Sequence, residues 1–410
     1  MPMRVLWFSP TPSMYDEGKV GGWVASLELA IRMYQPDIKL AIAFDSMDVA
    51  ASKVERENVT YYPMRHAYSL ADCIKMKFGA EVVGDTYVDD LIRVVNDFGP
   101  DIIQCFGSEW PYGMIREHTD VPVVIHMQGF LNIYNLSGSL ALSRHDAYRC
   151  DRIGPKRLYH AFFDWRCSET ADALEREIMA KNRFFMGRTE WDRNIVRYFS
   201  PGAEYFHCEE ALRPAIYCSE HIWRWTDGTP RIITITQAGI LKGNEMILRT
   251  AKILKEMFHY DFTWRVAGNR ASFVRFERKT GIRCEDVGIE LLGMIPAEQV
   301  AEELSSARVY VHPAIIDNSP NSLCEAQILG CPVIATYAGG IPSMVRDGET
   351  GFLYPYDEPY ALAFKIMGIL DDRKMLERVS ARERATALTR HKPQAIAERV
   401  VEVYSHILNI

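Results

Sequence analysis

The middle of the C-terminal half reads His312-Pro-Ala-Ile-Ile-Asp317-Asn-Ser-Pro-Asn-Ser322-Leu-Cys-Glu325-Ala-Gln-Ile-Leu-Gly330. The apolar residues that end at His312 predict a strand, the polar residues after it a turn, and those from Ser322 a helix. Ser322 and Glu325 have the spacing of a capping box, which would begin the helix at Ser322. This order of elements is typical of a parallel α/β sheet.

The start of this helix predicts an anion site. The N–H groups of Asn321, Ser322 and Leu323 would point out of the helix, where the dipole and the donors together favour a diphosphate. Asp317 lies on the loop beside them and could accept two sugar hydroxyls. Alternatively, Glu325 caps its own helix and Asp317 only starts a turn. From this stretch alone, the two interpretations are equally supported.

The alternation of strands and helices extends through the chain in both directions. In the N-terminal half we expect strands at Arg4–Ser9, Lys39–Phe44, Asp101–Gly107, Val121–Met127 and Arg183–Gly187. In the C-terminal half we expect strands at Ile232–Thr236, Phe262–Ala267, Glu290–Leu292, Arg308–His312 and Pro332–Thr336. Helical spacing of apolar residues predicts helices at Gly22–Tyr34 and Asp85–Phe98. Apolar strands separated by helices indicate parallel sheets covered on both faces.

The length of 410 residues exceeds what one hydrophobic core supports, so we expect two domains. Leu212–Pro230 is rich in turn residues and separates the halves. We expect an N-terminal domain over residues 1–215, a linker over 216–230, a C-terminal domain over 231–390 and a final helix over 391–410. Both domains would be doubly wound and Rossmann-like, with ligands beyond the carboxyl ends of the strands.

Composition and missing motifs exclude several classes of protein. The net charge of -7 argues against nucleic acid as the main partner. The nine cysteines contain no C-x-x-C pair, and no apolar run is long enough to span a membrane, so we expect a cytoplasmic protein. The dinucleotide-binding, P-loop, zincin and α/β-hydrolase motifs are absent, and no D-x-D metal clamp stands out.

The segment from Asp317 onward resembles the retaining GT-B glycosyltransferases of family four. Asp317 and Glu325 have the spacing of that family's Glu-x7-Glu element. The resemblance continues through Pro332-Val-Ile-Ala-Thr336, Gly339-Gly340-Ile-Pro342 and Asp347-Gly348-Glu-Thr-Gly351. It is strong over residues 231–355 and looser in the first 220 residues. It implies a GT-B fold, in which two Rossmann-like domains face a cleft and the C-terminal helix crosses back to the first domain.

The resemblance also implies roles for residues of the C-terminal half. Asp317 would contact the donor sugar, and Glu325 would hold the ribose hydroxyls. Aspartate replaces the family's first glutamate, which leaves the sugar hydroxyls that it reaches undetermined. Lys242, in Gly239-Ile-Leu-Lys242-Gly243, would bind the donor phosphates. By itself, this pattern favours a solvated turn lysine.

Three further sites follow from the same resemblance. Gly21 and Gly22 belong to a glycine loop that would close on the diphosphate, although a simple tight turn would also explain it. His126 ends an apolar strand; such a histidine is more often structural, but the family carries one here that orients the donor sugar. Met294 and Ile295 would read the nucleotide base.

Three other stretches depart from the family pattern or have a structural interpretation. The family's usual arginine near the donor phosphates is absent at Thr236-Gln237. Thr189 is interpreted as a helix N-cap rather than a site residue. Arg144–Trp165 mixes basic and aromatic residues, and a salt-bridged, packed face is favoured over contact with a membrane surface or a lipid phosphate.

These observations predict a retaining hexosyltransferase that takes a nucleotide diphosphate sugar and an acceptor saccharide, lipid-linked glycan or small molecule. Catalysis would involve His126, Asp317 and Lys242, with no metal and no other cofactor. A location in the cytoplasm, including the inner face of the membrane, fits this activity. The alternatives are a nucleotide-sugar epimerase, a polymerising transferase like glycogen synthase, or a non-enzymic nucleotide-sugar-binding protein.

Overall fold

The computed structural model describes residues 2–15, 22–48, 50–66, 70–71, 83, 86–150, 169–237 and 239–409. The chain forms two compact units. Unit 1 consists of Met1–Asn135, Phe162–Arg213 and His391–Ile410, and unit 2 of Leu136–Ala161 and Pro214–Arg390. Unit 2 therefore includes a segment that lies, in sequence, within the range expected for the N-terminal domain.

Unit 1 is built on an eight-stranded sheet in the order β3-β4-β2-β1-β5-β6-β7-β8. Its strands are β1 (Arg4–Ser9), β2 (Lys39–Asp45), β3 (Val54–Arg56), β4 (Val59–Met64), β5 (Ile102–Phe106), β6 (Val123–His126), β7 (Phe184–Gly187) and β8 (Glu204–His207). All neighbours are parallel except β3 and β4. Its helices are α1 (Gly22–Tyr34), α3 (Tyr87–Phe98), η1 (Pro111–His118), α7 (Glu190–Phe199) and α15 (Pro393–Leu408).

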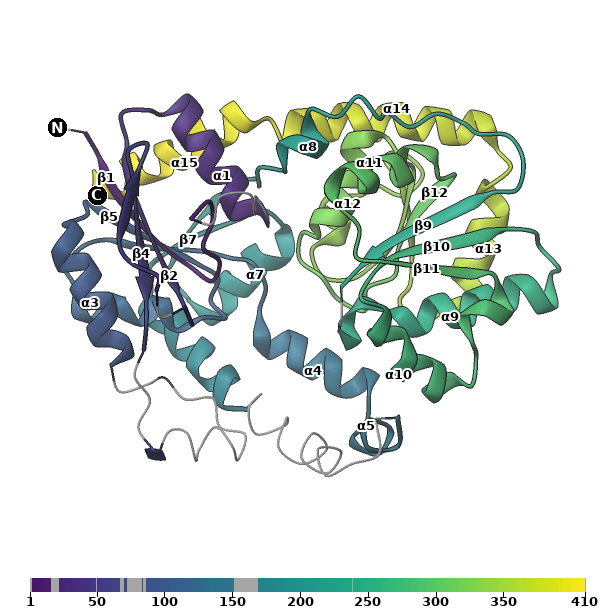
Figure 1. Ribbon diagram of the computed structural model, residues 1–410, viewed down its shortest axis with the longest axis horizontal. Coiled ribbons are helices and arrows are strands. Elements are labelled where there is room, and N and C mark those ends of the chain that lie inside the picture. The colour runs from purple at the N-terminus through teal and green to yellow at the C-terminus, as the bar shows by residue number, and fades with distance from the viewer. Residues whose placement is uncertain are drawn as a thin grey trace. The chain divides into compact units, whose positions relative to one another are not determined.

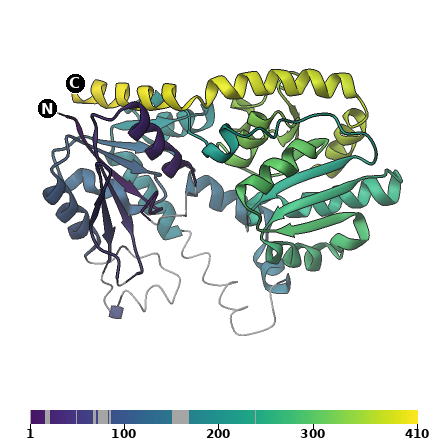
Figure 2. The ribbon, with the colours of Figure 1, turned by 45° about the horizontal axis from the view of Figure 1, so that its top comes forward.

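Side chains alternate between the two faces of this sheet, because successive residues of a strand point in opposite directions. Val5 and Trp7 of β1 pack in one core with residues of α1 and α15. Leu6 and Phe8 of the same strand pack in a second core with residues of α3 and η1. The C-terminal helix α15 thus belongs to the core of unit 1, where it runs beside α1 (Figures 1 and 2).

Unit 2 is built on a six-stranded, fully parallel sheet in the order β11-β10-β9-β12-β13-β14. Its strands are β9 (Arg231–Thr236), β10 (Thr263–Gly268), β11 (Ile289–Gly293), β12 (Val309–His312), β13 (Val333–Thr336) and β14 (Phe352–Tyr354). Its helices are α5 (Arg144–Cys150), α8 (Pro214–Tyr217), η2 (Ile240–Lys242), α9 (Asn244–Lys252), η3 (Ile253–Met257), α10 (Arg270–Thr280), η4 (Cys284–Val287), α11 (Ala297–Ser306), α12 (Asn321–Leu329), η5 (Ile341–Ser343), α13 (Pro359–Ile369) and α14 (Arg373–Arg390). The boundary between the two units falls within helix α4 (Leu131–Ala141), whose first five residues are assigned to unit 1 and the rest to unit 2.

Helices cover both faces of the six-stranded sheet. Helices α9, α10 and α13 lie on one face, and α11, α12 and α14 lie on the other (Figure 1). The two doubly wound parallel sheets predicted from the sequence are confirmed. Within the part of the chain that the structure describes, no helix is both long and apolar enough to cross a membrane.

Candidate functional site

The carboxyl ends of the strands in unit 2 meet at one edge of the sheet, because all of its strands are parallel. The loops after β9, β11 and β12 carry the residues that the sequence singled out in this half. Open α/β sheets bind their ligands at this edge.

Lys242 and Asp317 meet at this edge although they are 75 residues apart in sequence. The Lys242 Nζ lies 2.7 Å from Asp317 Oδ2, in an ion pair whose lysine side chain is 33% exposed and whose aspartate is 13% exposed. The Ile315 N–H donates to the Leu241 carbonyl at 2.8 Å, which joins the two loops through their backbones. The loop lysine therefore has a fixed partner and is not a solvated turn residue.

Gly243 explains why the two loops can come so close. Its φ is +70°, and a Cβ atom there would lie 1.8 Å from the Pro313 carbonyl oxygen. Only glycine combines this backbone conformation with such a close approach. The glycine after Lys242 is thus required by the geometry of the site.

Several groups hold Asp317 in place. Its Oδ1 accepts from the Asn318 N–H at 3.1 Å, and its Oδ2 lies 3.5 Å from His312 Nε2. The Gly340 N–H donates to its carbonyl at 2.9 Å. Burial raises the pKa of the Asp317 carboxyl, but Lys242 and His312 outweigh burial and hold that pKa well below its usual range. Asp317 is therefore an ionised acceptor at neutral pH.

The start of helix α12 differs from the prediction. The helix begins at Asn321, its N-cap is Pro320, and no side chain caps it, so the predicted capping box of Ser322 and Glu325 is wrong. The Pro320 carbonyl accepts from the N–H groups of Leu323 at 3.0 Å and Cys324 at 3.2 Å. The N–H of Leu323 is therefore engaged within the helix, against the expectation that it would face a ligand.

The hydroxyl of Ser322 has a different use. Tyr310 Oη lies 2.9 Å from Ser322 Oγ and also 2.9 Å from His312 Nδ1. Burial lowers the pKa of His312, although Asp317 opposes this effect. A buried polar chain therefore connects the first turn of α12 to Asp317.

The other predicted donor-site residues lie on the same edge. Glu325 is buried, in the second turn of α12. Ile295 is half-buried and Met294 is exposed, in the loop that follows β11. Gln237, at the place of the family's missing arginine, is exposed directly after β9.

His126 ends strand β6 of unit 1 and is fully buried. Its ring contacts that of Trp23, with centroids 4.8 Å apart, and its Nδ1 lies 3.2 Å from Gln104 Nε2. Burial, reinforced by the positive charge of Arg188, holds the pKa of His126 well below its usual value, so the imidazole is neutral. Gly22 is the first residue of α1, with φ +84°, whereas Gly21 lies outside the described residues.

Two ionisable residues that follow strands of the unit 1 sheet were not among the predicted site residues. Arg188 follows β7, forms a buried ion pair with Glu210 and donates to the Met127 carbonyl at 3.0 Å. Glu109 lies three residues after β5, and burial raises its pKa to about 7. Both follow parallel strands, so applying the carboxyl-edge rule to every strand would have found them. Thr189, next to Arg188, caps α7 as predicted.

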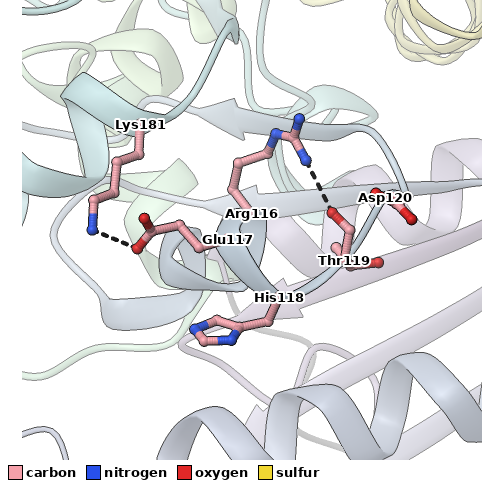
Figure 3. A pocket seen from close by; sticks show the side chains of 6 residues that line it. All are labelled: Arg116, Glu117, His118, Thr119, Asp120 and Lys181. Carbon is pink, nitrogen blue, oxygen red and sulfur yellow. Dashed lines mark hydrogen bonds and ion pairs between the residues drawn. The ribbon is translucent and has the colours of Figure 1, made fainter.

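A surface hollow near η1 is a less suitable site. Figure 3 shows its lining, which comes from Arg116 to Asp120 together with Lys181. It lies just before β6, at the amino end of that strand, and the Lys181 ammonium is already paired with Glu117 and Glu177. The carboxyl edge of each sheet, taken by itself, therefore remains the better candidate.

The side chains at these edges include no evident metal centre. Among the described residues, no three or more histidines, cysteines, aspartates or glutamates are grouped as metal ligands would be. Metal independence remains a prediction.

Comparison with known proteins agrees with a candidate site at the carboxyl edge of the unit 2 sheet. Residues 220–386 match the family model of the glycosyl transferases group 1. This group 1 segment contains Lys242, Asp317, Glu325 and the whole carboxyl edge of the six-stranded sheet. D-inositol 3-phosphate glycosyltransferase of Streptomyces griseus is 37% identical to the chain over 90 residues, which are 22% of this chain and 19% of that protein. The chain spans about a third or less of the length of the curated relatives that it matches.

Solved structures resemble the protein along its whole length. The superposition with sucrose-phosphate synthase of Thermosynechococcus elongatus covers 99% of each chain, with a TM-score of 0.74 and 15% sequence identity. HepE of Anabaena, solved in complex with UDP and glucose, covers 98% of this chain and 100% of its own with a TM-score of 0.66 and 13% identity. The GT-B fold class expected from the sequence is thus confirmed.

Proposed function

We propose that the protein is a retaining glycosyltransferase that moves a hexose from a nucleoside diphosphate sugar to an acceptor hydroxyl, without a metal ion. The observation that carries this proposal is the Lys242–Asp317 pair beside the start of α12, within the group 1 segment. It combines a cation suited to phosphate with an ionised acceptor suited to sugar hydroxyls. The UDP and glucose bound to HepE, which shares the fold, support this class of donor.

In the proposed reaction, Lys242 and the first-turn N–H groups of Asn321 and Ser322 stabilise the negative charge that develops on the departing diphosphate. A lysine ammonium has three N–H donors, so Lys242 can bind phosphate while it stays paired with Asp317. Asp317 accepts hydroxyls of the donor sugar, and Glu325 accepts those of the ribose.

The bond changes follow from this arrangement. The bond between the anomeric carbon and the phosphate oxygen breaks, while the acceptor oxygen bonds to the same carbon on the same face. The acceptor proton passes to the leaving phosphate oxygen, so no carboxylate base is needed. His126, in unit 1, orients the donor sugar. Exclusion of water would prevent hydrolysis of the donor.

A thermal-shift screen of nucleoside diphosphates and their sugar conjugates, with a chelator present, tests the donor site. A ligand of the native state raises the unfolding midpoint by mass action. We expect one nucleoside diphosphate and its sugar conjugate to do so. If none of them shifts the midpoint, the assignment of Lys242, Asp317 and Glu325 is wrong. NMR of the anomeric proton in the product tests retention.

Two substitutions separate the roles of the acidic residues. Glu325→Ala should weaken nucleoside diphosphate binding several-fold, since it removes the ribose contact. Asp317→Ala should abolish transfer, since it removes the sugar contact. It should not weaken that binding, since the Lys242 ammonium that it releases from the ion pair can still bind phosphate. Equal loss of nucleotide binding in both variants would contradict this division.

A further inference from the structure

Four buried side chains form a continuous hydrogen-bonded chain in unit 1, from the C-terminal helix to His126. Trp7 Nε1 lies 2.9 Å from Tyr404 Oη, Tyr404 Oη lies 2.5 Å from Gln104 Oε1, and Gln104 Nε2 lies 3.2 Å from His126 Nδ1. The residues come from β1, α15, β5 and β6, and each is at most 1% exposed. Water therefore does not compete for these bonds.

The chemistry of each group fixes the direction of the whole chain. The indole N–H of Trp7 can only donate, so the Tyr404 oxygen accepts and its own proton goes to Gln104 Oε1. The opposite end of the Gln104 amide is then its NH₂ group, which can only donate. His126 Nδ1 must therefore accept, and the single proton of the neutral imidazole lies on Nε2.

On the side of the His126 ring opposite Nδ1, the Nε2–H group is a hydrogen-bond donor without an acceptor in the described part of the chain. His126 Nε2 is buried and has no hydrogen-bond partner among the described residues. A buried donor without an acceptor is unfavourable, and such groups in native structures usually have a functional reason. His126 lies at the carboxyl end of β6, where a ligand can supply the missing acceptor.

We propose that Tyr404 is a positioning residue, which acts through Gln104 to hold His126 as the Nε2–H tautomer and so present a hydrogen-bond donor to the substrate sugar. The substrate contact rests on the proposed function, whereas the tautomer does not. The C-terminal helix thus contributes to the site through a buried hydroxyl, not through a residue that contacts substrate.

NMR of the full chain without ligand tests the tautomer directly. In protein labelled with ¹⁵N-histidine, two-bond correlations from the ring protons show which nitrogen carries the proton. Comparison with His126→Gln identifies the signals of His126 among those of the 11 histidines. We expect the Nε2–H tautomer in the wild type. A proton on Nδ1 would overturn the proposal.

Two variants break the chain at different points and preserve aromatic packing. Tyr404→Phe removes the hydroxyl that orients the Gln104 amide, and Trp7→Phe removes the donor that orients the hydroxyl. Both should lower the Nε2–H population. Tyr62→Phe is the control, since it removes a partly buried hydroxyl of the same unit that binds Asp97 instead. Unchanged tautomers in both chain variants would overturn the proposal.

Kinetics then link the tautomer to transfer. Tyr404→Phe should lower kcat about threefold to tenfold, the effect of one buried hydrogen bond, with nucleoside diphosphate affinity unchanged. An unchanged kcat in a variant whose tautomer has shifted would refute the positioning role. If the wild type transfers no sugar at all, the proposed function fails, and the NMR result still decides the tautomer.

Discussion

At the scale of single residues, the charge of Lys242 matters because of where it is held. Lys365 provides a close comparison in the same unit: its side chain is 31% exposed, against 33% for Lys242, and each lysine is paired with an aspartate. They differ in position, since only Lys242 lies beside the start of α12. The similar exposure of the two lysines therefore allows a controlled test, although the Lys365 pair is longer, at 3.6 Å, and its Asp347 is 54% exposed.

Lys242→Ala should lower kcat/KM for transfer by about tenfold to a hundredfold, because it removes a charge-assisted bond worth about 1.5–3 kcal/mol in the transition state. Lys365→Ala should leave the kinetics unchanged, and steady-state assays of the two variants are the measurement. Equal effects in both variants would mean that Lys242 acts only through general electrostatics or stability.

Glu109 gives the protein a specific pH dependence of stability. Its pKa is raised from 4.5 to about 7 in the folded state, so between these values the folded protein binds more protons than the unfolded chain. The contribution of Glu109 to stability is therefore fully present below pH 4.5 and is lost as the pH rises to about 7.

Glu109→Gln should abolish this decline, because glutamine does not titrate. The free energy of unfolding of the wild type should fall between pH 5 and pH 8 by up to about 3 kcal/mol more than that of the variant. Urea denaturation at both pH values measures the difference. Parallel pH profiles would show that Glu109 ionises freely.

At the scale of elements, the sequence best predicted those strands and helices that local patterns of apolar residues determine. Strand β1 and helix α1 were predicted with the bounds that the structure shows, because apolar runs and helical spacing are local signals. Strands β3, β4, β8 and β14 were not predicted. Proline interrupts β4, charged ends flank β8, and β3 and β14 have only three residues each. The start of α12 was misplaced because the Ser322 and Glu325 spacing matches a capping box, whereas Pro320 already provides the N-cap.

Contacts between distant elements were beyond prediction from local sequence. The Lys242–Asp317 pair and the chain from Tyr404 to His126 depend on strand order and register, which bring together residues 75 and 278 positions apart. The family resemblance identified Lys242, Asp317 and His126 as candidates, and neither it nor the local pattern gave any sign of their partners. Gly243 connects local sequence with tertiary structure, because the absence of a side chain at this position allows the Lys242 loop to approach Pro313.

Gly243→Ala tests this link, with Gly281→Ala as its control. The two glycines have nearly equal φ angles, +70° and +71°, but a Cβ atom would clash with Pro313 only at position 243. Gly281→Ala should cost about 1 kcal/mol of stability through backbone strain alone. Gly243→Ala should cost at least about twice as much and should also reduce transfer. Denaturation and kinetic assays measure both, and equal stability losses would exclude the clash.

At the scale of the whole molecule, the end of the chain folds into the unit where the chain began. Helix α15 follows unit 2 in sequence, yet Ile396, Ala397 and Val400 belong to a core of unit 1. Each unit has its own sheet and its own buried residues. We therefore expect damage to α15 to destabilise unit 1 and to leave nucleotide binding by unit 2 intact.

Ala397→Asp and Ala395→Asp form a matched pair on this helix. Ala397 is fully buried against the sheet, whereas Ala395 is exposed in the first turn. The buried aspartate should cost about 3–5 kcal/mol, since its charge has no partner. The exposed one should be neutral or slightly stabilising near the positive end of the helix dipole. In urea, unit 1 of Ala397→Asp should unfold first, while a nucleoside diphosphate still shifts the transition of unit 2. A single transition, with nucleotide binding lost at the same urea concentration, would instead show that the two units fold as one cooperative body.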